Sequence, residues 1–244
     1  MRVPTTAVTP SLTGPDGKPL TWVGATPHST GKPGDPTNIT VAVETTNYPE
    51  DQGYPPPFTH PLPQEFLPLL RAAEDTWELY ANVKFTNVPD AASKDQSADI
   101  RVGMADLGDL PTMNFVGPTV GRTTSHYNKT SDTFQPDTLV RIEDPADTPV
   151  TRLSNGDYQY SGLEATVFQD LLVELGHALG LGNNPSDPNS IMYSTEGSKN
   201  RVPDAQDIAA IQAKYGVPKP HSVALNSSEI ATLKGLGILP ASFT

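Results

Sequence analysis

The 244-residue chain contains no cysteine and few basic residues, and both shortages exclude classes of protein. Without cysteine the chain has neither a disulfide nor a thiolate metal site. Its 16 lysines and arginines stand against 28 aspartates and glutamates, which gives a formal net charge of −12. Such a molecule repels phosphate backbones and anionic lipid, so we expect no nucleic-acid partner.

Long apolar runs are also missing. Those present are short and interrupted by charge or glycine, so we expect no membrane span and no membrane partner. The first residues, MRVPTTAVTPSLTG, hold one arginine and no apolar stretch, which predicts no signal peptide in this segment.

Three segments of different composition divide the chain. Residues 1–37 are dense in proline, glycine and threonine, which predicts an irregular N-terminal arm. Residues 38–216 carry strand and helix patterns and are predicted to form the main domain. Residues 217–244 form a C-terminal extension, in which SSEIATLKGLGI predicts a short helix capped by Ser227 or Ser228.

Within the main domain the patterns alternate between strand and helix. Alternating apolar and polar residues predict strands at 38–45, 83–88, 98–106 and 138–144. The segment GPTVGRTTSHYNKTSDTF is expected to form an edge strand with a long loop, and the proline-dense residues 48–63 a solvated loop. Apolar residues at helical spacing predict helices at about 64–83, 162–180 and 203–216. This order predicts a mixed α+β domain with the long second helix packed against a sheet.

The helix predicted at 162–180 contains the stretch VELGHALGLGN. Ser161 and Glu164 stand in the relation of a capping box at its start, and two glycines end it. On a helical wheel Glu174 and His177 share the less apolar face with Asp170 and Val173. A glutamate and a histidine three residues apart can act as base and metal ligand, or form a plain ion pair.

The frame x-E-x-x-H-x-x-G-x-x-N runs from Val173 to Asn183, and Met192 follows nine residues later in SIMYS. It resembles the metzincin zinc peptidases, nearest to the matrixin and serralysin branches, whose signature is H-E-x-x-H-x-x-G-x-x-H followed by a methionine turn. TWELYANVKFTNV, ADIRVGM and DIAAIQAKYG extend the resemblance over most of residues 20–216. It implies a twisted sheet, a long active-site helix, a methionine turn and a C-terminal helix.

The resemblance also implies roles for five residues. Glu174 corresponds to the general base, His177 to the second zinc ligand and Gly180 to the glycine of the turn. Met192 corresponds to the methionine beneath the metal, and Tyr193 follows it as in matrixins.

Two positions depart from the family pattern. Val173 stands where the first zinc ligand belongs, and Asn183 where the third belongs. An isopropyl group cannot bind a metal, and a catalytic zinc needs three protein ligands. We therefore expect no cofactor, with Glu174 and His177 left as vestiges of a catalytic centre.

Two main functions follow. The first is a pseudopeptidase that still binds an extended polypeptide or protein ligand. The alternative is an active zinc endopeptidase with non-standard ligands, in which Glu174 is the base and His177 holds zinc with oxygen donors such as Asn183 or Asp187. Asp170 lies about 10 Å from His177 along the helix axis, too far to share one ion directly. A variant altered to prevent autolysis ranks lower, because the glutamate is retained.

The resemblance implies a secreted protein. The remaining histidines, His28, His60, His126 and His221, are predicted to be surface residues, with His126 nearest a possible cleft edge.

Overall fold

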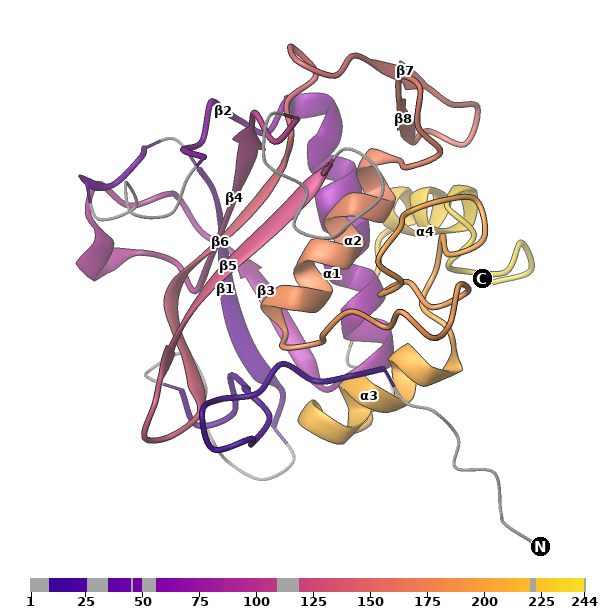
Figure 1. Ribbon diagram of the computed structural model, residues 1–244. Helices are drawn as coiled ribbons and strands as arrows, with labels where there is room; N and C mark the ends of the chain where they lie inside the picture. Colours follow the sequence, from indigo (N-terminus) through magenta and orange to yellow (C-terminus); the bar gives the residue numbers. More distant parts are fainter. Residues whose placement is uncertain are drawn as a thin grey trace, which may run out of the picture.

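The computed structural model describes residues 9–25, 35–44, 46–49, 56–108, 119–219 and 223–243 (Figure 1). The strands are β1 (Thr37–Val43), β2 (His60–Pro61), β3 (Val83–Asn87), β4 (Ile100–Ala105), β5 (Gly121–Asn128), β6 (Thr133–Glu143), β7 (Val150–Arg152) and β8 (Tyr158–Tyr160). The helices are α1 (Leu67–Tyr80), α2 (Val167–Ala178), α3 (Ala205–Tyr215) and α4 (Ser227–Gly235). The predicted mixed α+β fold with a twisted sheet is confirmed. His28 and His221 lie outside the described residues.

The main sheet has the strand order β3-β1-β4-β6-β5, with β2 paired to β4. Strands β3, β1, β4 and β6 run parallel, whereas β5 is antiparallel to β6 and forms the edge. The expected edge strand is therefore present, but the four residues 129–132 turn it directly into β6 where a long loop was expected. Helices α1 and α2 lie side by side against the sheet (Figure 1).

Apolar side chains from both long helices form the core. Trp77 of α1 is fully buried, and its Nε1 donates to the carbonyl of Leu172 on α2 (3.1 Å). Leu171 and Leu175 of α2 are buried as the helical wheel predicts. The opposite face of α2 is buried as well, because β5 covers it, and only His177 of this helix is partly exposed.

The start of α2 differs from the expectation. The helix begins at Val167 after Thr166, whose hydroxyl accepts from Gln169 N, so the predicted capping box at Ser161 is wrong. Glu164 instead accepts from the backbone N–H and the hydroxyl of Ser198. The short hairpin of β7 and β8 precedes the helix and was not predicted.

Residues from both flanking segments pack onto the main domain. Trp22 is buried and donates from Nε1 to the carbonyl of Ala178 at the end of α2 (2.9 Å). Helix α4 lies against α1, with Leu233 buried. Its N-cap is Asn226, which forms a capping box with Glu229, rather than Ser227 or Ser228. Within the described residues no helix is long and apolar enough to cross a membrane.

Candidate functional site

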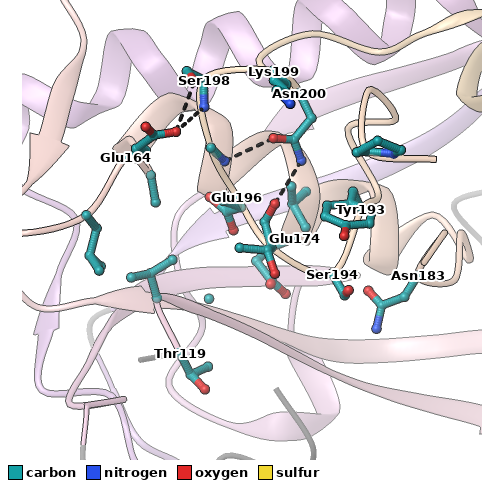
Figure 2. A pocket seen from close by; sticks show the side chains of 18 of the residues that line it. Thr119, Glu164, Glu174, Asn183, Tyr193, Ser194, Glu196, Ser198, Lys199 and Asn200 are labelled. Carbon is teal, nitrogen blue, oxygen red and sulfur yellow. Dashed lines mark hydrogen bonds between the residues drawn. The ribbon is translucent and has the colours of Figure 1, made fainter. Parts of the chain in front are cut away.

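A pocket of about 730 Å³ opens between α2, the start of β5 and residues 193–200 (Figure 2). It brings together five residues that the sequence singled out: Val173, Glu174, His177, Asn183 and Tyr193. Gly180 and Met192 do not line it. Its other walls come from residues 119–121 and 162–165 and from the segment that follows Tyr193.

Glu174 lies at the boundary between α2 and β5. The hydroxyl of Thr123 lies 2.5 Å from Glu174 Oε2 and 3.0 Å from its carbonyl oxygen. A Cβ atom on Gly121 would lie 2.6 Å from Glu174 Oε1, so the strand approaches the helix this closely only because residue 121 is glycine. Burial raises the pKa of Glu174, against the opposing effects of His177, Thr123 and Arg122.

A second carboxyl group, that of Asp170, lies one turn earlier on the same face. It is fully buried, and Tyr160 donates to its Oδ2 (3.1 Å) while Oδ1 has no hydrogen-bond partner within the described part of the chain. The Cβ position of Gly121 is 2.0 Å from Asp170 Oδ1, so the carboxyl groups of Asp170 and Glu174 face the same point. Burial raises the pKa of Asp170 well above its usual value, and the charges of Glu196 and Glu174 raise it further.

His177 retains the geometry of a potential ligand. Its Nδ1 lies 2.8 Å from the carbonyl oxygen of Leu181, and a carbonyl can only accept a hydrogen bond. Nδ1 therefore carries the proton of the neutral ring, and Nε2 keeps the lone pair that a metal would require.

Val173 and Asn183, which the sequence predicts to stand at the other two ligand positions, do not complete a zinc site. Val173 presents an isopropyl group to the pocket, and Asn183 is an exposed carboxamide. Among the described residues no group of three or more His, Asp or Glu side chains could hold a metal ion. One imidazole and a carboxamide do not fit a catalytic zinc, which takes three protein ligands and water.

Asp187, which the alternative reading names as a substitute ligand, lies elsewhere. It accepts hydrogen bonds from Gln206 and from the backbone and side chain of Asn189, and it is not part of the pocket wall. The structure therefore does not bring it together with His177.

Met192 and Gly180 do not line the pocket, but both contact neighbouring segments closely. Met192 is fully buried, and its Sδ lies 2.8 Å from where a Cβ on Gly176 would be, so methionine and helix are in direct contact. Gly180 has φ of 90°, and a side chain there would also meet the carbonyl of Leu20 at 2.6 Å. The first contact places Met192 against α2 at Gly176, and its role as the methionine of the family turn is a prediction.

Hydrogen bonds of Asn200 stabilise the outer wall of the pocket, which residues 194–200 form. Asn200 Oδ1 accepts from Gly197 N (2.9 Å), and its backbone carbonyl accepts from Gln169 of α2 (2.8 Å). This wall carries Glu196, whose Oε2 is buried without a hydrogen-bond partner in the described structure. Burial raises the pKa of Glu196 well above its usual value, and the charge of Glu174 adds to the effect.

Sequence reasoning missed Thr123, Glu196 and Asn200. None belongs to a motif, and only the fold brings them to α2. His126 lies on β5 but does not line the pocket, and its Nδ1 lies 2.9 Å from the carbonyl of Asp137. His60 is exposed, 2.7 Å from Asp144 Oδ2.

Strand β5 offers its outer edge beside the pocket. Glu143 N of β6 donates to Val120 O (2.7 Å), and hydrogen-bonded pairs alternate along an antiparallel ladder. The backbone groups of Gly121 and Thr123 therefore point away from β6. In the described residues no strand pairs with this edge.

The family model of the matrixins matches residues 62–216, which is more than half of the chain. The chain therefore belongs to the matrixin family, and the resemblance seen in the sequence is confirmed. Matrixins are normally zinc-dependent peptidases and are generally extracellular. A comparison with curated proteins found no match.

Proposed function

We propose that this matrixin domain has lost its catalytic zinc and is a pseudopeptidase that binds an extended polypeptide without cleaving it. The proposal rests on the potential metal ligands that the pocket contains. Of the three family ligand positions, Val173, His177 and Asn183, only His177 supplies a strong zinc ligand. Changes in residues that merely orient zinc ligands cost about 10- to 100-fold in affinity, so replacing two ligands costs more.

The remaining architecture supports polypeptide binding. The outward backbone groups of Gly121 and Thr123 can pair with an added strand, a mode that needs no metal. Because side chains alternate along a strand, every second residue of the added strand would turn toward the pocket and α2. Family membership is the ground for proposing that the protein acts outside the cell.

The alternative, an active zinc endopeptidase, has less support. Glu174 and His177 are both present in the pocket, but Asp187 is engaged by Gln206 and Asn189. If Glu174 itself bound the zinc, no carboxylate would remain at the position of the base.

A displayed library of random peptides, panned on the full chain, tests the proposal. We expect selected peptides to bind and to lose about tenfold in affinity when alternate amides are N-methylated, because each methyl group removes a backbone hydrogen bond. After incubation with micromolar zinc, mass spectrometry should find the peptides intact. Failure to select any peptide would overturn the binding function, and cleavage that a chelator stops would establish the alternative.

A further inference from the structure

The glutamate side chains that line the pocket differ in whether they accept hydrogen bonds from the protein. Glu164, Glu174 and Glu196 all line it (Figure 2). Glu164 accepts two hydrogen bonds from Ser198, at 3.0 and 2.9 Å, and Glu174 accepts one from Thr123. Glu196 Oε2 is buried and has no partner in the described part of the molecule.

A second oxygen without a partner lies behind the pocket wall. Asp170 is fully buried, its Oδ1 has no partner among the described residues, and it points at the backbone of Gly121, which lines the pocket. A buried carboxyl oxygen that lacks a donor carries a desolvation cost, which a cation entering the pocket can offset.

Basic groups of the protein lie near these carboxyl groups but engage them only in part. Lys199 is the basic residue of the pocket wall, and it is exposed. Arg201 acts on Glu196 electrostatically, but its guanidinium donates to the carbonyl oxygen of Glu164. The described pocket therefore holds more carboxyl groups than basic groups that could pair with them.

The shape and lining favour an organic cation on a long stem. The volume of about 730 Å³ is in the range that holds a bound side chain or small ligand. Val120, Leu163 and Val173 supply apolar wall, against which the methylene groups of lysine or arginine can pack. A metal ion fits less well, since no three His, Asp or Glu side chains of the described residues converge to hold one.

We infer that the pocket selects a lysine or arginine side chain of the bound polypeptide, with Glu196 as the residue that pairs with its charge. The inference rests on the proposed polypeptide binding. Strand β5 would hold the backbone of the polypeptide. Thr119, Val120 and Gly121, which lead into this strand and form one wall of the pocket, would direct one side chain inward. The polypeptide partner is thus expected to carry a basic residue within its extended segment.

The test uses the tightest peptide from the displayed library, resynthesised with lysine, arginine, norleucine or glutamate at each position in turn. Affinities for the full chain are measured by fluorescence anisotropy. At one position we expect lysine and arginine to bind about tenfold or more tightly than norleucine, which has a similar length and no charge. Glutamate should bind most weakly there.

Two variants locate the effect. Glu196→Gln should abolish the preference for a basic residue while peptides still bind. Glu164→Gln is the matched control, because Ser198 already occupies that carboxylate, and it should keep at least half of the preference. Circular dichroism of both variants establishes that they fold.

The outcomes distinguish a failure of the predicted selectivity for a basic side chain from a failure of the proposed polypeptide binding. If peptides bind but norleucine equals lysine at every position, the inference is wrong and the polypeptide-binding function stands. Selectivity that survives Glu196→Gln would overturn the assignment of Glu196. If no peptide is selected at all, the proposed function fails and the inference falls with it.

Discussion

Among the single residues, Gly121 determines how close β5 comes to α2. Its missing side chain leaves room for Asp170 Oδ1 and Glu174 Oε1, which lie 2.0 and 2.6 Å from the Cβ position. Both carboxyl groups belong to a buried helix face. A methyl group at residue 121 must therefore displace either the strand or the carboxyl groups.

We expect Gly121→Ala to lower the free energy of unfolding by about 1–3 kcal/mol, the range for overpacking a close contact. Urea denaturation measures the change. Gly108→Ala is the matched control, because among the described residues the atom nearest to a Cβ there is Glu143 Oε1, at an ordinary 3.5 Å. Equal effects of the two substitutions would contradict the close approach at Gly121.

Residue identity alone predicted part of the pocket. Val173, Glu174, His177, Asn183 and Tyr193 all line it, since a motif fixes their spacing on one helix and the chain that follows. Asp170 was considered only for its distance from His177, and Glu196 was not considered. The charge of Glu196 acts on Asp170 because residues 193–200 fold back over α2, which periodicity does not encode.

At the level of secondary structure, α4 is attached to α1 through Arg71. Its guanidinium lies 3.1 Å from Glu74, 2.5 Å from Asp75 and 3.5 Å from Glu229 of α4. Glu74 and Asp75 are fully buried, so Arg71 supplies the positive charge that faces them. The docking of the C-terminal helix thus depends on an ionic contact as well as on Leu233.

Arg71→Met should lower the free energy of unfolding by about 2 kcal/mol at roughly pH 8, less than for a fully buried pair because Arg71 is 31% exposed. Hydrogen exchange should speed up in α4 more than in α2. Arg152→Met, on the exposed strand β7, is the control and should change both quantities little. Unchanged exchange in α4 would show that Arg71 does not hold it.

Element boundaries were harder to predict than elements. The long periodic segments were found because alternation and helical spacing persist over many residues, as in β4 and α1. The capping residues were wrong because several polar side chains precede each helix, and the fold selects Thr166 and Asn226. The hairpin of β7 and β8 was missed because a strand of three residues is too short to show alternation.

In the molecule as a whole, buried carboxyl groups and a net charge of −12 both make the folded state less stable as the pH rises. Burial raises the pKa of both Glu74 and Asp75 to about 7, from ordinary values of 4.5 and 3.8. Between those ordinary values and about 7 the folded state holds protons that the unfolded state has released. The contribution of Glu74 and Asp75 to stability therefore falls as pH rises through this window and levels off above it.

We expect the melting temperature to be higher at about pH 6 than at about pH 8, the reverse of a protein stabilised by ionised carboxylates. The paired substitution Glu74→Gln/Asp75→Asn should flatten the profile, because neutral amides no longer titrate. Differential scanning calorimetry at constant ionic strength makes the comparison. A melting temperature that rises from pH 6 to pH 8 would contradict the assignment of raised pKa values.

The proposal that this matrixin domain lacks zinc is tested most directly by counting zinc per chain. The native protein and the variant Val173→His/Asn183→His are equilibrated with micromolar zinc, desalted and measured by elemental analysis. Both positions line the same pocket as His177, so the variant regains three imidazoles there. We predict less than about a tenth of an equivalent in the native chain and about one in the variant. A full equivalent of zinc in the native chain would contradict the loss of the metal site.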